Sequence, residues 1–181
     1  MMGSIDSMKI LAIDPGSRIA GFACLEADLK DGVVPLPQNF KVLDVGLIKM
    51  DLSKHHSYRI GQLHIAVFEM IKDLRPDVFV LEKAFYGVNV NTALKLGETR
   101  GALISAARRH GLEVREITPA SVKKVITGKG QAPKEDVAQS LQRLLGFDIG
   151  SMKHDASDAV ALALSFGLMW DGGGGDDADK N

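Results

Sequence analysis

The 181-residue sequence has one cysteine, no long apolar run and almost no net charge. The single Cys24 excludes an internal disulfide framework and a zinc site built on cysteines, and it favours a reducing, cytoplasmic setting. The longest apolar stretch, residues 159–170, is too short and too interrupted to span a membrane. Residues 1–8 are polar and lack the apolar segment of a secretory signal, so we interpret them as a leader or vector-derived residues, with Met8 as a candidate natural start.

The formal net charge of −1 argues at first against a nucleic-acid partner. The charge is unevenly distributed, however. Residues 171–181 carry four aspartates and one lysine, so the other 170 residues sum to +2. Nine basic residues against four acidic ones occur between Arg100 and Arg143. A basic region of this kind can neutralise phosphates even on a nearly neutral protein, although the total remains modest for a DNA-binding protein.

Length and composition predict one domain over residues 9–170 and a flexible, acidic, glycine-rich tail over residues 171–181. Short apolar segments predict strands at residues 9–14, 19–26, 40–50, 78–82 and 112–117. Helical spacing and end signals predict helices at residues 57–74, 91–110, from 119, 134–145 and 154–168. This order predicts an α/β fold with a five-stranded mixed sheet and helices on both faces, which resembles the RNase H-like fold.

Carboxylates end two of the predicted strands. Asp14 directly precedes Pro15 and Gly16, and Glu82 ends the apolar strand at residues 78–82. Each has an ordinary explanation, because aspartate before Pro-Gly is common turn chemistry and a glutamate past a strand is often merely solvated. In sheets of this type, however, sites form at the carboxyl ends of strands. If the two strands are neighbours, both side chains point into one small volume.

Asp155 and Asp158 are three residues apart in the last predicted helix and therefore share a face. The helix dipole explains one of them, but an aspartate on a mostly apolar helix must be paired or bound to a cation. Four carboxylates brought together need a cation, and oxygen ligands select Mg²⁺ or Mn²⁺. Two such ions can hold a phosphate, generate hydroxide and stabilise a leaving oxygen. The spacing therefore supports a metal site of four carboxylates.

Four motifs resemble those of the RuvC family of Holliday-junction resolvases in order and separation. They are IDPGSRIAGFA, LEKAFYGVNVNTALKLGETRGAL, SVKKVITGKGQAPKEDV and HDASDAVALAL, and together they span essentially residues 9–168. The resemblance implies a homodimeric endonuclease of DNA recombination and repair that binds a four-way junction. Each subunit is expected to nick one of two strands of like polarity, leaving ligatable ends.

The same resemblance implies the ligands and partners. The matching metal-binding and catalytic carboxylates are Asp14, Glu82, Asp155 and Asp158. They imply two Mg²⁺ ions in each active site, for which Mn²⁺ substitutes. The family also suggests the branch-migration proteins RuvA and RuvB as partners.

Lysines and aromatic residues at motif positions are the next candidates. Lys123 and Lys134, by default solvated helix residues, match family residues near the scissile phosphate, where a lysine can offset developing negative charge. Phe85, with Tyr86 second, matches an aromatic residue that stacks on unpaired bases at the junction centre. On composition alone, an aromatic pair after a strand is more often part of a core.

Several weaker candidates complete the prediction. Lys124 and Lys129 are expected contacts to the DNA backbone. The resemblance places Asn89, Asn91, Lys95 and Arg100 along a helix that in the family runs close to both the DNA and the dimer partner; Asn89 and Arg100 are the DNA-binding candidates, and which residue faces which partner stays open. Small residues of that helix would allow close packing against a neighbour; they are Ala93, Gly97, Gly101, Ala102 and Ala106. We interpret His154 as a capping or surface residue, with a general base or metal ligand as the alternative.

Other functions stay open at this point. An RNase H-fold nuclease for RNA precursors, as in the YqgF group, shares the first strand but is not expected to carry AFYGVN and ALKLGETRG. A non-catalytic junction-binding relative is disfavoured by the four acidic positions. Sugar-kinase and actin-like ATPases need two such domains and a longer chain. The acidic tail and the irregular segment 28–39 depart from the family pattern, which leaves DNA affinity less supported than the chemistry.

Overall fold

The computed structural model describes residues 7–16, 18–29, 35–83, 89–146 and 154–170. The strands are β1 Ser7–Asp14, β2 Ile19–Asp28, β3 Phe40–Lys49, β4 Val78–Glu82 and β5 Glu113–Ile117. The helices are α1 His56–Leu74, α2 Val90–Arg109, α3 Pro119–Thr127, α4 Lys134–Leu145 and α5 His154–Leu168, with a short 3-10 helix η2 at Pro37–Asn39. The predicted strands and helices are confirmed, with bounds that agree within two residues.

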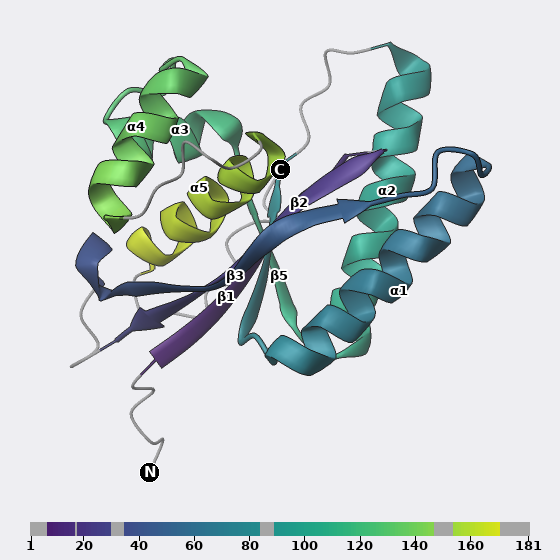
Figure 1. Ribbon diagram of the computed structural model, residues 1–181, viewed down its shortest axis with the longest axis horizontal. Helices are drawn as coiled ribbons and strands as arrows, with labels where there is room; N and C mark the ends of the chain where they lie inside the picture. Colours follow the sequence, from purple (N-terminus) through teal and green to yellow (C-terminus); the bar gives the residue numbers. More distant parts are fainter. Residues whose placement is uncertain (1–6, 17, 30–34, 84–88, 147–153, 171–181) are drawn as a thin grey trace, which may run out of the picture.

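The strands form one sheet in the order β3-β2-β1-β4-β5. The β1–β2 and β2–β3 pairs are antiparallel, whereas β1–β4 and β4–β5 are parallel, so the sheet is mixed as predicted. Helices α1 and α2 cover one face, and α3, α4 and α5 lie on the other (Figure 1). Among the described residues, none of the helices combines the length and apolar character needed to cross a membrane.

The first strand begins two residues before the predicted start of the domain. Ser7 already pairs with β2, and Met8 is only 4% exposed in the layer against α5. Met8 is therefore part of the core, although its position near the start of the chain had placed it in the predicted leader. The predicted tail at residues 171–181 lies outside the described residues.

Successive side chains of the central strands β1 and β4 point to opposite faces of the sheet, so they contribute to two apolar layers, one on each face. Ala12 of β1 and Val80 of β4 belong to the layer against α5, while their neighbours along each strand belong to the layer against α1 and α2. Because successive side chains of a strand point to opposite faces, Asp14 and Glu82 fall on the α5 side of the sheet. The strand period thus brings two carboxylates to the same face.

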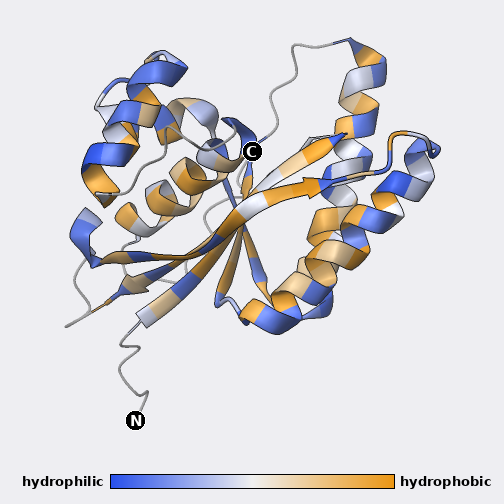
Figure 2. Cartoon of the chain, viewed as in Figure 1, coloured by the Kyte–Doolittle hydropathy of each residue, from blue (hydrophilic) through white to orange (hydrophobic). Residues whose placement is uncertain are grey.

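Helix α5 packs directly on this sheet face. Eleven of its fifteen residues are buried, so a polar side chain on it needs a specific partner. Figure 2 shows it as a largely apolar helix. Its first turn touches β2 at Gly21, where an added Cβ would lie 1.8 Å from the carbonyl oxygen of Asp155. Gly21 is the register partner of Asp14, so the start of α5 is held against the strand pair that carries Asp14.

Candidate active site

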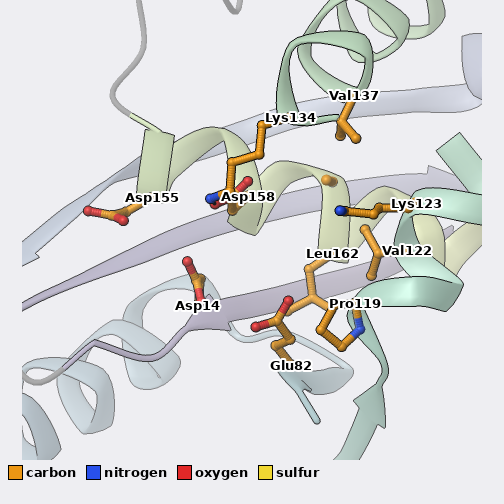
Figure 3. A pocket seen from close by; sticks show the side chains of 11 residues that line it. Asp14, Glu82, Pro119, Val122, Lys123, Lys134, Val137, Asp155, Asp158 and Leu162 are labelled. Atoms are coloured by element: carbon orange, nitrogen blue, oxygen red, sulfur yellow. The ribbon is translucent and has the colours of Figure 1, made fainter. Parts of the chain in front are cut away.

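A pocket of about 410 Å³ opens beside the carboxyl ends of β1 and β4, between the sheet, α5 and the helices α3 and α4 (Figure 3). It is lined by Asp14, Glu82, Pro119, Val122, Lys123, Lys134, Val137, Asp155, Asp158, Ala161 and Leu162. The structure therefore brings together the four carboxylates and the two lysines that the sequence predicts as catalytic.

The parallel pairing of β1 with β4 positions the first two carboxylates. The register pairs Ile13 with Leu81, and the next residue of each strand is Asp14 and Glu82, respectively. Because parallel strands end at the same edge of a sheet, both carboxylates emerge there. The sequence left open whether the two strands are neighbours, and the structure shows that they are.

Helix geometry positions the other charged groups. Asp155 and Asp158 lie one turn apart in α5 and both line the pocket, with the Asp155 carboxylate at its edge, directed away from Asp158 (Figure 3). The hydroxyl of Thr118 accepts a hydrogen bond from the Ser121 amide at 3.1 Å, which caps α3. This cap fixes the start of the helix from which Lys123 extends into the pocket (Figure 3).

Burial and mutual repulsion perturb the strand carboxylates. Burial, followed by the negative charges of Glu82 and the two α5 aspartates, raises the pKa of Asp14 from 3.8 to about 7. Burial, followed by the charge of Asp158, also raises the pKa of Glu82. Lys134, Arg100 and Lys123 oppose that second shift. Negative charge is therefore incompletely compensated in the pocket, which favours a bound cation.

One lysine already compensates part of this charge. The Nζ of Lys134 donates a hydrogen bond to Oδ2 of Asp158 at 2.8 Å. That hydrogen bond is the main cause of the raised pKa of Lys134. The lysine side chain is 65% exposed, so it can leave Asp158 without crossing the core. The Lys134–Asp158 pair therefore lies at the exposed side of the pocket.

The donor set fits a hard divalent cation. All four acidic groups offer oxygen, which suits Mg²⁺ or Mn²⁺, and no cysteine or histidine lines the pocket among the described residues. Within the same part of the chain, no group of three or more His, Cys, Asp or Glu residues is close enough to form a preformed metal cage. One of the four carboxylates, Asp158, is instead paired with Lys134.

Arg100 has partners that the sequence did not reveal. Its guanidinium donates hydrogen bonds to the backbone carbonyl of Glu82 and to the carboxylate of Glu116 on β5. These partners lie 16 to 18 residues away along the chain, so no local pattern indicates them. The role of Arg100 as a DNA contact stays a prediction.

The other candidates lie outside the pocket wall or outside the described residues. Five predicted polar positions are exposed; they are Asn89, Asn91, Lys95, Lys124 and Lys129. The Asn89 side chain caps α2 by accepting from the Asn91 amide at 2.8 Å. His154 is exposed at the start of α5 and is not among the described residues that line the pocket. Phe85 and Tyr86 fall outside the described residues.

Comparisons with known proteins identify the family of this chain. The family model described as crossover junction endodeoxyribonuclease RuvC matches residues 10–166. A RuvC from Chlorobium phaeovibrioides is 36% identical over 92% of this chain and 84% of its own length. A RuvC from Chlorobaculum parvum is 40% identical over 86% of this chain and 79% of its own length.

Solved structures of Holliday junction resolvases are similar to this chain in fold. Thermus thermophilus RuvC in complex with a Holliday junction superposes with a TM-score of 0.79 at 27% identity, covering 90% of this chain and 96% of that chain. This match bears out the predicted RNase H-like architecture. The yeast mitochondrial Holliday junction resolvase Ydc2, with a TM-score of 0.62 and 12% identity, shares the fold alone.

Proposed function

This chain belongs to the RuvC family of crossover junction endodeoxyribonucleases, and from that membership we propose how its pocket cuts DNA. The chain is an endonuclease that resolves Holliday junctions, and nucleases of this family depend on metal ions. The observation that carries the proposed mechanism is the convergence of four carboxylates from β1, β4 and α5 on one pocket.

Asp14, Glu82, Asp155 and Asp158 would hold two Mg²⁺ ions, for which Mn²⁺ substitutes. The support is an all-oxygen donor set with uncompensated negative charge. When bound, such ions polarise a phosphoryl oxygen and lower the pKa of a coordinated water.

The two lysines would hold the phosphate. Lys123 and Lys134 line the same pocket as the carboxylates. Once the charge of Asp158 is compensated otherwise, the exposed Lys134 ammonium is free to contact a phosphate oxygen and to offset the negative charge that develops there. Val122 and Leu162, which are 8% and 2% exposed, form an apolar part of the pocket wall beside Lys123 (Figure 3).

The DNA contacts extend outward from the pocket. Lys124 and Lys129 are exposed on and just after α3, near Lys123 in sequence, and are proposed to bind the phosphate backbone together with the exposed Asn89. Phe85, with Tyr86 second, is proposed to stack on unpaired bases at the junction centre.

A second copy of the chain is proposed to pack on α2. Val90 and Leu94 are 74% and 61% exposed, and Gly97 and Gly101 follow them on the same helical face. A Cβ added at either glycine would meet no atom within 4 Å, so a partner helix can approach closely there. A homodimer has two active sites related by symmetry, one for each of the two junction strands to be cut. Family membership is also the ground for proposing RuvA and RuvB as partners and the cytoplasm as the location.

Substrate choice tests the proposal. The protein and its Asp14→Asn variant are incubated with a synthetic four-way junction, a linear duplex of the same sequence and a structured RNA, with Mg²⁺ or with EDTA. We expect paired nicks in the junction alone, only with Mg²⁺ and only for the unmodified protein. Cleavage of RNA in preference to the junction, or junction binding without cleavage in Mg²⁺ and Mn²⁺, would contradict the proposal.

A further inference from the structure

Arg100 joins three elements behind the active site. It extends from α2 to the end of β4, where its guanidinium donates to the backbone carbonyl of Glu82, and it also pairs with Glu116 on β5. Its side chain is 11% exposed, and it is neighboured on α2 by the buried Thr99. Arg100 is therefore a nearly buried cation whose guanidinium connects α2 to β4 and β5 through two acceptors of the same chain.

The sheet pairs the end of β4 on one side only, where Glu82 is the register partner of Ile117 on β5. The pairing of β4 with β1 ends at Ile13 and Leu81, one residue before Glu82. On the other side, the Lys83 amide donates to the Ile117 carbonyl at 2.8 Å. The Glu82 carbonyl receives its hydrogen bond from Arg100. Backbone carbonyls away from water need a partner, and a bond from a charged donor is stronger than a neutral one.

We propose that Arg100 is a positioning residue that fixes the backbone of Glu82, so that the Glu82 carboxylate is presented to the cation in the pocket. This inference rests on the proposed metal site. The planar guanidinium suits the role because its fork of donors reaches the Glu82 carbonyl and the Glu116 carboxylate at once, whereas an ammonium is a point charge without that geometry.

The low exposure of the Arg100 side chain favours the positioning role over a direct contact to DNA. Lys134, on the pocket mouth, has a side chain that is 65% exposed, whereas that of Arg100 is 11% exposed. A phosphate would have to take the guanidinium from two acceptors that it already satisfies. Arg100 is therefore expected to affect metal binding without affecting metal-free DNA binding.

The experiment measures Mn²⁺ uptake by the free, full-length protein with calorimetry, and junction binding in EDTA with fluorescence anisotropy. The variants are Arg100→Met and Arg100→Lys, and Lys72→Met is the control because it removes an exposed positive charge on α1. We expect Arg100→Met to weaken Mn²⁺ binding at least about tenfold, as for other groups that orient metal ligands. Arg100→Lys should recover part of the affinity, and junction binding in EDTA should stay within about twofold of the unmodified protein.

The outcomes distinguish a failure of the positioning role of Arg100 from a failure of the proposed metal site. Unchanged Mn²⁺ affinity in Arg100→Met, or lost junction binding with metal affinity retained, would overturn the positioning role. If Arg100→Met fails to fold, Arg100→Lys decides alone, since an affinity equal to that of the unmodified protein contradicts the need for a forked donor. If the unmodified protein takes up no Mn²⁺, the proposed metal site itself is wrong.

Discussion

At the scale of single residues, the position of Asp14 in the pocket lowers the stability of the fold at neutral pH. Its pKa is raised from 3.8 to about 7, first by burial and then by the neighbouring carboxylates. The folded protein therefore keeps a proton that the unfolded chain has already lost. By linkage, this raised pKa makes the metal-free protein less stable as pH rises from about 4 to about 7, and the loss is complete above pH 7.

Asp14→Asn removes this penalty, because an amide carries no charge. In EDTA at pH 8 the variant should melt about 5 to 10 °C higher than the unmodified protein, and at pH 4 the two should melt at similar temperatures. Differential scanning calorimetry at several pH values measures the difference. A difference in Tm that stays constant between pH 4 and pH 8 would contradict the raised pKa of Asp14.

Lys134 is expected to compete with the metal for Asp158, because its ammonium binds that carboxylate at 2.8 Å. Lys134→Met removes the competitor and a positive charge, so Mn²⁺ should bind more tightly. Junction cleavage should nevertheless fall about 100-fold, since a charge proposed to act on the phosphate is lost. Calorimetry and single-turnover cleavage measure the two effects. If Lys134→Met bound Mn²⁺ more weakly, or cleaved the junction at the rate of the unmodified protein, Lys134 would not compete with the metal for Asp158 and act on the phosphate.

At the scale of elements, the contact between α5 and β2 sets the geometry of the site. The backbone of Asp155 lies against Gly21, so that even one added carbon atom meets main-chain atoms that cannot rotate away. Gly21 also pairs with Asp14 across the β1–β2 register. A shift of α5 on β2 therefore changes the distance between the strand carboxylates and the helix carboxylates.

Gly21→Ala is expected to displace the first turn of α5, to cost about 1 to 3 kcal/mol of stability by overpacking and to slow junction cleavage more than 10-fold. Gly61→Ala is the matched control, because Gly61 is exposed on α1 with no atom within 4 Å of an added Cβ. That control should be neutral or stabilised by up to about 1 kcal/mol. Urea unfolding and cleavage assays compare the pair; equal behaviour of both variants would refute the account of this contact.

Helix α2 is expected to carry the subunit interface. Leu94→Asp places a charge in the exposed apolar and small-residue face formed by Val90, Leu94, Gly97 and Gly101. The charge should weaken dimerisation at least 10-fold with little change in Tm of the monomer, because Leu94 is already exposed in the isolated chain. Sedimentation velocity over a range of concentrations measures this. A dimer of unchanged affinity would exclude this face as the interface.

The sequence predicts the site well where local periodicity determines it. Asp14 and Glu82 end apolar strands with a period of two, and Asp155 and Asp158 follow a helical spacing, so the face on which each side chain lies depends on short-range geometry. Their meeting in one pocket depends on the pairing of β1 with β4, which the sequence left open. The link from Arg100 to Glu82 and Glu116 could not be predicted in this way. It depends on how α2 lies across the sheet, and no spacing within the chain encodes that distance.

At the scale of the whole molecule, the strand order places the site in the middle of the sheet. In the order β3-β2-β1-β4-β5, the two carboxylate-bearing strands are neighbours and α5 lies over them (Figure 1). The parallel β1–β4 pair joins segments that lie far apart in sequence, and α5 adds the end of the domain. The net charge of −1 favours a protein that binds DNA through a local basic region rather than through its total charge.

Four carboxylates are proposed to form the metal site of this junction endonuclease. The most direct measurement is junction cleavage in Mg²⁺ by Asp14→Asn, Glu82→Gln, Asp155→Asn and Asp158→Asn, with Glu135→Gln as a control in the first turn of α4. We predict a rate at least about 1,000-fold lower for each of the four, junction binding retained in EDTA, and unmodified cleavage by the control. Cleavage at the unmodified rate by any of the four variants would contradict the account.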